Sequence, residues 1–252
     1  MGIWWSGIQL TSRSDCGEPC AGNLHARFLE EFISIVKSLE GEINLLMKVL
    51  LINGSPHKDG CTNVALEECA KTLNQNGIET EILWLGVKAI QGCIACGKCR
   101  KLGKCVFDDD VNKVAERADE FDGLIVGCPV YYGGPCSEIT AFLDRLFYSA
   151  HGKLQTKPGA AIVSCRRGGA TASFERLNKY FEINNMPVVT SQYWNQIHGN
   201  SKEQALQDEE GLQTMRTLAL NMAWLLKCIE AGKKAGIEKP QYEPTVFTNF
   251  IR

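Results

Sequence analysis

The sequence predicts an α/β protein built on a doubly wound parallel sheet of five strands, with helices on both faces. From residue 47 onward, short apolar runs alternate with segments in which apolar residues recur every three or four positions. Two of these runs, 49–52 and 123–128, are almost continuously apolar, which is typical of strands buried on both faces of a parallel sheet. Repeated strand–helix units of this kind require right-handed crossovers, which place helices on both sides of the sheet.

The strands are expected at 49–52, 79–85, 123–128, 159–165 and 187–190. Helices are expected at 64–76, 108–120, 139–147, 170–183 and 212–229. Residues 1–46 do not continue the alternation, so we expect an N-terminal extension that is poorly ordered or helical. The sheet domain is expected to span 47–236, and an irregular tail to span 237–252.

Composition narrows the possible partners and location. The chain has 252 residues and a net charge of −2, so it offers no basic surface for nucleic acid or for an acidic membrane. No apolar run approaches the roughly 20 residues of a membrane span. Several of the 12 cysteines fall inside expected strands and helices, where cysteine acts as a small apolar residue. This distribution favours a reducing cytoplasm over a disulfide framework.

The loop after the first strand is expected to bind a phosphate. Its backbone N–H groups and the positive end of the following helix converge on one point. A Walker A loop is disfavoured because Cys61 stands where its lysine belongs, and the spacing of Gly54 and Gly60 does not fit a dinucleotide loop. These features suit a terminal monophosphate, as in FMN, and an ordinary strand–helix turn stays open as an equal alternative for this loop alone. The candidate contacts are Ser55, Pro56, His57, Lys58, Gly60, Thr62 and Asn63.

Two further loops are expected beside this one, because ligands of such sheets bind at the carboxyl ends of the strands. The loop after the third strand offers aromatic faces next to glycines that let a flat ring approach the backbone. The loop after the fourth strand offers amides and positive charge. The candidate contacts are Pro129, Val130, Tyr131, Tyr132, Gly133 and Gly134 in the first of these loops, and Ser164, Arg166, Gly168 and Gly169 in the second.

Four cysteines follow the second strand at the spacing C-x2-C-x2-C-x5-C, namely Cys93, Cys96, Cys99 and Cys105. A compact triple with two-residue spacers suits a cubane iron–sulfur cluster, whereas structural zinc sites more often use two separated knuckles. Neighbouring lysines and arginines would offset the negative charge of either metal site. At this point a [4Fe–4S] cluster, a zinc ion and free thiols all remain open.

Taken together, these motifs resemble the flavodoxin-like NAD(P)H-dependent FMN reductases, and specifically the iron–sulfur flavoproteins among them. The resemblance covers residues 47–199 and rests on the G-S-P-x-x-x-G-x-T-N loop, the P-V-Y-Y-G-G-P loop with Asp144 and Arg145 downstream, and the four cysteines. It implies FMN in the three loops, a [4Fe–4S] cluster on the cysteines, and a homodimer or homotetramer. It also implies NADH or NADPH as hydride donor, and a quinone, another small molecule or a protein as acceptor.

The expected function is therefore that of an FMN-dependent NAD(P)H oxidoreductase, in which the flavin carries the chemistry. No side chain is expected to act as an obligatory acid or base. Trp194 is expected in the core and His198 at the surface, with a place beside the substrate as the less favoured alternative. Two other functions stay open: an electron carrier without its own substrate, and a redox or metal sensor based on the four cysteines.

Overall fold

The computed structural model of the protein describes residues 47–248 and residue 250. The chain divides into two units, Met1–Leu45 and Leu46–Arg252, and every described residue belongs to the second. The expected N-terminal extension, 1–46, lies outside the described residues.

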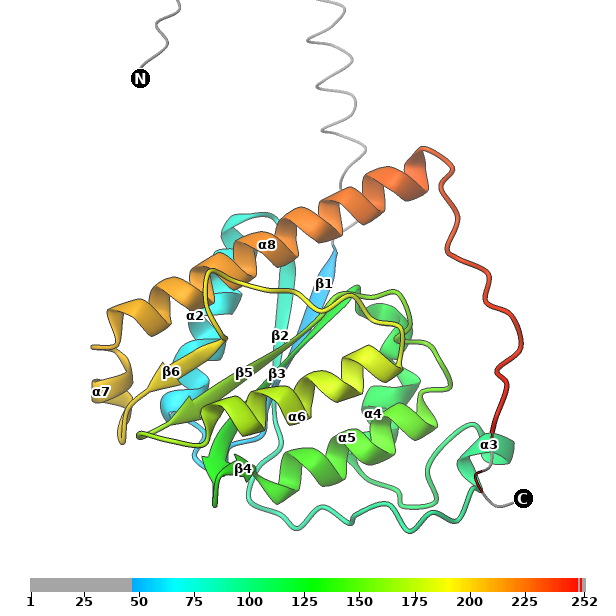
Figure 1. Ribbon diagram of the computed structural model, residues 1–252, viewed down its shortest axis with the longest axis horizontal. Coiled ribbons are helices and arrows are strands. Elements are labelled where there is room, and N and C mark those ends of the chain that lie inside the picture. The colour runs from blue at the N-terminus through cyan, green and yellow to red at the C-terminus, as the bar shows by residue number, and fades with distance from the viewer. Residues whose placement is uncertain (1–46, 249, 251–252) are drawn as a thin grey trace, which may run out of the picture. The chain divides into compact units, whose positions relative to one another are not determined.

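Five parallel strands form the sheet in the order β2-β1-β3-β5-β6, which confirms the predicted doubly wound α/β fold (Figure 1). A sixth, two-residue strand, β4, folds back antiparallel onto the end of β3. The bounds are β1 (Lys48–Asn53), β2 (Glu79–Trp84), β3 (Gly123–Tyr131), β4 (Gly134–Pro135), β5 (Gly159–Cys165) and β6 (Gln196–His198).

The fifth parallel strand lies later in the chain than predicted. Within the expected stretch 187–190, Val188 makes only a single bridge to Gly159, and the edge strand is β6. Pro187 has no N–H to donate to a ladder. The chain then turns at 191–195, where the Ser191 hydroxyl donates to the side-chain oxygen of Asn195 (2.7 Å). Only after this turn does the chain return to the sheet.

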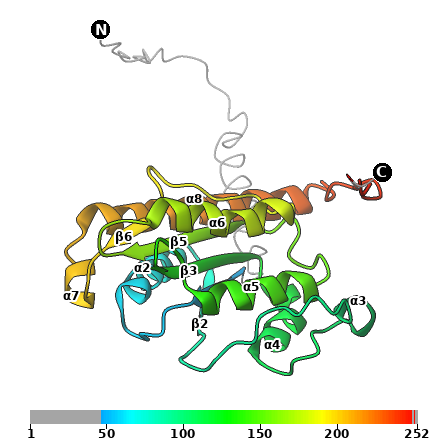
Figure 2. The same ribbon diagram turned by 60° about the horizontal axis from the view of Figure 1, so that its bottom comes forward.

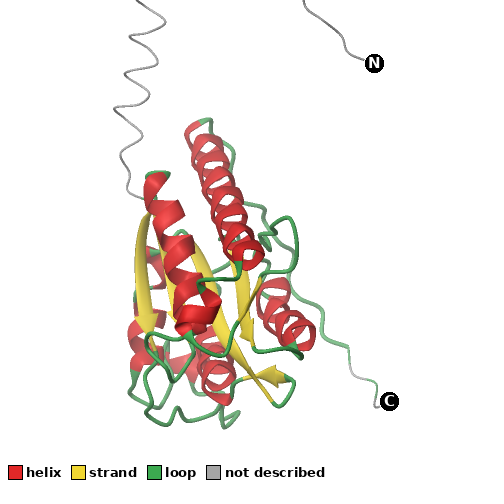
Figure 3. Cartoon of the chain, turned by 90° about the vertical axis from the view of Figure 1, so that its left-hand side faces the viewer, coloured by secondary structure: helices red, strands yellow, loops and turns green. Residues whose placement is uncertain are grey.

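Helices cover both faces of the sheet (Figure 3). Helices α2 (Cys61–Gln75) and α8 (Glu209–Lys234) pack on one face. Helices α4 (Asp110–Glu116), α5 (Ser137–Ser149) and α6 (Ala170–Ile183) pack on the other, and α4 lies beside α5 (Figure 2). Three short elements complete the fold: α3 (Cys99–Leu102), η1 (Ala118–Glu120) and α7 (Lys202–Ala205).

Strand β1 shows why its apolar run is continuous. Leu50 and Ile52 belong to the core under α4, α5 and α6, whereas Val49 and Leu51 belong to the core under α2 and α8. Successive side chains of a strand point to opposite faces, so burial on both faces requires every position to be apolar. The same constraint applies to β5, in which all seven residues are buried.

Two glycines let helices approach the sheet closely enough to shape its carboxyl edge. A Cβ atom on Gly127 of β3 would lie 2.9 Å from side-chain atoms of Leu66 and Thr62 on α2. A Cβ atom on Gly54 would lie 2.8 Å from the Cβ of Ile139 on α5. The starts of α2 and α5 are thereby fixed against the ends of β3 and β1.

Within residues 47–248 and 250, no helix combines the length and the apolar character needed to cross a membrane.

We predict that a chain beginning at Met47 folds and binds flavin. All five parallel strands, their covering helices and the three candidate loops lie within the described residues. Circular dichroism and flavin retention on gel filtration measure the outcome. Insoluble or flavin-free protein would show instead that residues 1–46 contribute to folding or to the site.

Candidate functional site

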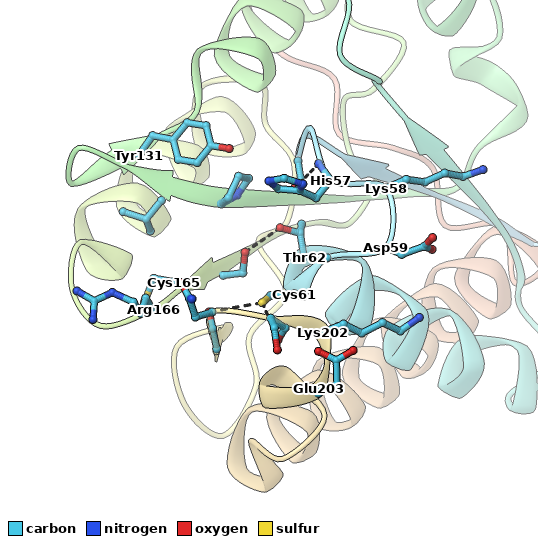
Figure 4. Close-up of a pocket in the computed structure, with 18 residues that line it drawn as sticks. His57, Lys58, Asp59, Cys61, Thr62, Tyr131, Cys165, Arg166, Lys202 and Glu203 are labelled. Carbon is cyan, nitrogen blue, oxygen red and sulfur yellow. Dashed lines mark hydrogen bonds between the residues drawn. The ribbon is translucent and has the colours of Figure 1, made fainter.

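A cavity of about 700 Å³ opens at the carboxyl ends of β1, β3 and β5 (Figure 4). All three predicted loops contribute to its wall, so the structure brings together segments that lie far apart in the sequence. The predicted residues that line it are Ser55, His57, Lys58, Gly60, Thr62, Pro129, Val130, Tyr131, Ser164 and Arg166. The remaining predicted contacts are Pro56, Asn63, Tyr132, Gly133, Gly134, Gly168 and Gly169, which lie outside this wall.

The first loop is tied into a compact turn by its own polar groups. The side-chain oxygen of Asn53 accepts a hydrogen bond from the N–H of Ser55 (3.0 Å), and the Ser55 hydroxyl oxygen accepts one from the N–H of His57 (3.2 Å). Gly60 occupies the N-cap of α2 and has no side chain to cap it, and the first turn carries no acidic residue. The helix therefore keeps its N-terminal amides and its positive end available to an anion.

Thr62 and Ser164 join the first loop to the third. Their hydroxyl oxygens lie 2.7 Å apart, and both residues are buried while lining the cavity. Asn63 was predicted to contact the ligand, but its side chain is buried and does not line the cavity. It accepts a hydrogen bond from Asn53 (3.2 Å) and donates one to Glu67 (2.7 Å), so it supports the turn from behind.

The second loop forms the short hairpin of β3 and β4, in which Tyr131 pairs with Gly134. Tyr131 lines the cavity, and burial raises the pKa of its hydroxyl. Tyr132 at the tip is fully exposed, adopts a left-handed conformation with φ 49° and is not among the residues that line the cavity. The hairpin therefore offers one tyrosine to the cavity, where the sequence suggested two.

The third loop packs against the second. Gly169 has φ 89°, a left-handed conformation, and a Cβ atom there would lie 2.7 Å from Val130 and 2.8 Å from the backbone of Gly133. Only glycine allows this approach. Gly169 thus acts by letting the two loops touch, and Ser164, Cys165 and Arg166 provide the surface that faces the cavity.

A fourth segment, which the sequence analysis missed, completes the wall between β6 and α7. It is attached to the first loop by Cys61, whose thiol lies 3.4 Å from the carbonyl oxygen of Gly199 and 3.2 Å from that of Ser201. The capping signal Ser201-x-x-Gln204 could have located it, since Ser201 caps α7. The lining residues not predicted are Asp59, Cys61, Cys165, Gly199, Asn200, Ser201, Lys202 and Glu203.

Trp194 is not a core residue, which corrects the prediction. Half of its surface is exposed, and its ring lies 4.5 Å from that of Tyr193, measured between centroids. The turn that precedes β6 carries both rings outward. Together with the partly exposed His198, they line a separate hollow of about 210 Å³.

The four predicted cysteines line one small hollow of about 30 Å³ at the far end of α5. Cys93 and Cys96 are exposed, and Cys99 and Cys105 are half-buried. Among the residues that the structure describes, no three histidine, cysteine, aspartate or glutamate side chains lie close enough together to hold a metal ion. All four cysteines therefore border the same hollow, but in the described residues their sulfur atoms are too far from one another to share a metal ion.

Arg145 fixes this loop from the body of the protein. Its guanidinium donates to both carboxylate oxygens of Asp109 (2.6 and 2.8 Å) and, through Nε, to the Sγ of Cys105 (3.2 Å). It also donates to the carbonyl oxygens of Gln91 and Phe107. Burial would lower the pKa of Arg145, but the hydrogen bonds to Asp109 and Cys105 outweigh it and raise the pKa. A buried, permanently charged side chain therefore holds the cysteine loop in place.

Comparisons with known proteins agree with this geometry. The family model described as NADPH-dependent FMN reductase matches residues 47–200. An iron–sulfur flavoprotein of Methanocaldococcus jannaschii is 33% identical over 192 residues, which cover 73% of this chain and 100% of the relative.

Among solved structures, RosB with a bound 8-demethyl-8-formylriboflavin-5'-phosphate intermediate superposes with a TM-score of 0.57 at 14% identity, covering 82% of this chain and 92% of RosB. A flavodoxin from the domain Archaea superposes with a TM-score of 0.50 at 16% identity, covering 72% of this chain and 99% of the flavodoxin. These two likenesses establish the flavodoxin-like fold. The family match over 47–200, together with the 33% identity to an iron–sulfur flavoprotein, shows that the chain belongs to the NADPH-dependent FMN reductase family.

Proposed function

We propose that this protein is an FMN-dependent oxidoreductase that takes a hydride from NADH or NADPH and passes electrons to a quinone, another small molecule or a protein. The cavity formed by three strand-end loops carries the proposal. It has the volume of a cofactor pocket, and the uncapped start of α2 opens into it. Bound FMN supplies both hydride acceptance and electron release.

The residues of the cavity suit the two ends of FMN. The amides of the first turn of α2, with the hydroxyls of Ser55 and Thr62, are the groups that would hold the phosphate. Pro129, Val130 and Tyr131 present an apolar and aromatic surface that would face the flavin ring. Lys58, Arg166 and Lys202 also line the cavity, and the acidic Asp59 and Glu203, labelled beside them in Figure 4, partly balance their positive charge.

We further propose that Cys93, Cys96, Cys99 and Cys105 hold a [4Fe–4S] cluster. Thiolates are the usual ligands of such clusters, and all four thiols line the same hollow. The hydrogen bond from Arg145 Nε to the Cys105 sulfur supplies positive charge at a ligand atom. Because the thiols stand apart in the structure, binding a cluster requires this short loop to contract.

Anaerobic mixing with NADPH and with NADH tests the proposed reaction. Flavin absorbance near its visible maximum should fall rapidly with at least one of the two donors. Flavin that stays oxidised with both donors, yet is reduced by dithionite, would support an electron carrier that has no nicotinamide substrate. Protein purified without flavin would favour the cysteine-based sensor.

Replacing Thr62 tests the phosphate site. Thr62→Val keeps the side-chain shape but removes a hydroxyl at the cavity wall, and a charge-assisted hydrogen bond contributes about 1.5–3 kcal/mol, so FMN affinity should fall roughly 10- to 100-fold. Riboflavin, which lacks the phosphate, should lose little affinity. Thr72→Val is the matched control, because Thr72 is also buried on α2 but donates to the Glu68 carbonyl away from the cavity. An equal loss for both flavins would contradict the assignment.

Replacing Cys96 tests the cluster. In Cys96→Ala, FMN and hydride transfer should survive because the flavin loops are separate, while delivery of single electrons to a protein acceptor should collapse. Iron and sulfide analysis with anaerobic spectra measures the outcome, and Cys228→Ala, another exposed cysteine, is the control. Wild-type protein that contains flavin but no stoichiometric iron and sulfide, even after reconstitution, would end the cluster proposal.

Replacing Arg145 tests how the cysteine loop is held. Arg145→Met keeps the bulk but strips Asp109, Cys105 and two carbonyls of their donor. Because the Asp109 side chain is 36% exposed, the cost should lie below that of breaking a fully buried pair, at about 1.5–3 kcal/mol. Arg176→Met, which removes an exposed arginine from α6, should cost less than about 1 kcal/mol. Urea unfolding gives both values, and amide exchange should rise across 91–109 in the first variant only. Similar small losses in the two variants would show that Arg145 does not organise the loop.

A further inference from the structure

Two buried cysteines face each other behind the second loop of the cavity. Cys128 lies in β3 and Cys136 is the N-cap of α5, so they stand at the two ends of the 129–135 hairpin. Their sulfur atoms lie 3.5 Å apart, and both residues have 0% of their surface exposed. They are distinct from the four cysteines of the second hollow.

Burial alone gives a cysteine no redox role, as Cys69 on α2 illustrates. Cys69 is also 0% exposed, but its thiol contacts the carbonyl oxygen of Met215 and burial raises its pKa. Cys136 differs because contact with the Cys128 thiol lowers its pKa, with help from the N–H of Ile139 at the start of α5. The Cys128 thiol also lies 3.1 Å from the carbonyl oxygen of Pro129, so its one proton is shared between the two acceptors. The Cys136 sulfur is therefore the better nucleophile, with a second sulfur already in contact.

The pair also connects the two loops that form the cavity wall. The backbone N–H of Cys136 donates to the sulfur of Cys128 (3.2 Å), and the Cys136 sulfur lies 3.1 Å from the carbonyl oxygen of Gly54. Gly54 immediately precedes Ser55, and Cys128 immediately precedes Pro129, both of which line the cavity. A shift of either sulfur would therefore displace the backbone at the start of the first loop and at both ends of the hairpin.

We propose that Cys128 and Cys136 form a redox-active dithiol that hydrogen peroxide oxidises to a disulfide, and that the disulfide weakens ligand binding in the cavity. The first part rests on the dithiol alone. The second part rests on the proposed function, because FMN is the ligand concerned.

The oxidation balances in two steps. The Cys136 thiolate attacks one oxygen of the peroxide, and with one proton yields a sulfenic acid and water. The Cys128 sulfur then attacks the Cys136 sulfur, an S–S bond forms, and the hydroxyl leaves as water with the Cys128 proton. Overall, two thiols and one peroxide give one disulfide and two waters. The sulfurs must close from 3.5 Å to about 2.05 Å, and peroxide must enter as the two-residue β3–β4 pairing opens.

The disulfide is expected to disturb the cavity for a geometric reason. Once bonded to Cys128, the Cys136 sulfur has no proton to donate to Gly54, so the contact between the two loops is lost. The new bond also pulls the end of β3 toward the start of α5, which packs directly against Gly54. In a close-packed interior such shifts displace the neighbouring backbone.

The test treats the reduced full-length chain with hydrogen peroxide, alkylates the remaining thiols after unfolding, and maps tryptic peptides. Cys128 and Cys136 are the sole cysteines of the tryptic peptide 118–145. That peptide should lose two hydrogen atoms in mass, resist alkylation and recover with dithiothreitol. Cys69 in the same sample should stay reduced. In Cys128→Ser, dimedone should label Cys136 as a sulfenic acid.

The cavity effect is measured as FMN affinity before and after oxidation. Affinity should fall about tenfold in oxidised wild type and should be unchanged by peroxide in Cys136→Ser, which keeps a donor toward Gly54. A peptide 118–145 that stays as reduced as Cys69 while exposed Cys93 and Cys228 oxidise would overturn the dithiol. A disulfide without a change in FMN affinity would overturn its control of the cavity. Reduced protein that binds no FMN would instead refute the proposed function and leave the disulfide result intact.

Discussion

The parallel register of β1, β3 and β5 is the constraint on which the rest of the structure depends. It sets Asn53 level with Gly127, and Pro129 level with Ser164, so three loops from distant parts of the chain leave the sheet at one edge. The hydrogen bonds of the ladder fix these positions whatever the loops contain. The cavity, the Thr62–Ser164 contact and the close approach of Gly169 to the hairpin all follow from that alignment.

Helix α5 connects the two regions to which we assign redox roles. Its first turn touches the cavity wall through Cys136 and packs on Gly54, and its last turns carry Arg145 to the cysteine loop. Arg145 lies nine residues after Cys136, the N-cap of α5, along this one helix. A helix that packs at both ends keeps the distance between the two regions constant, which the proposed electron transfer between flavin and cluster would require.

The sequence was most informative where burial is complete. The apolar runs of β1, β3 and β5 identified three strands and therefore three cavity loops, because a strand buried on both faces tolerates few polar residues. It failed at β6, a three-residue strand in which only Ile197 is buried, and so it missed the 199–203 segment. Cysteine spacing identified the thiols around the second hollow, but spacing along a chain does not fix the distances between sulfurs. The roles of Asn63 and Gly169 also depended on contacts with residues that no local pattern identifies.

Hydrogen–deuterium exchange with and without FMN measures the central claim, that one ligand is held jointly by the loops after β1, β3 and β5 and by the segment after β6. FMN should slow exchange together in 54–63, 129–135, 164–169 and 199–203, and should leave the cysteine loop at 93–105 unchanged. Riboflavin should protect the hairpin at 129–135 but protect 54–63 much less, because it carries no phosphate. Protection confined to a single loop, or centred on the hollow beside Trp194, would contradict the account.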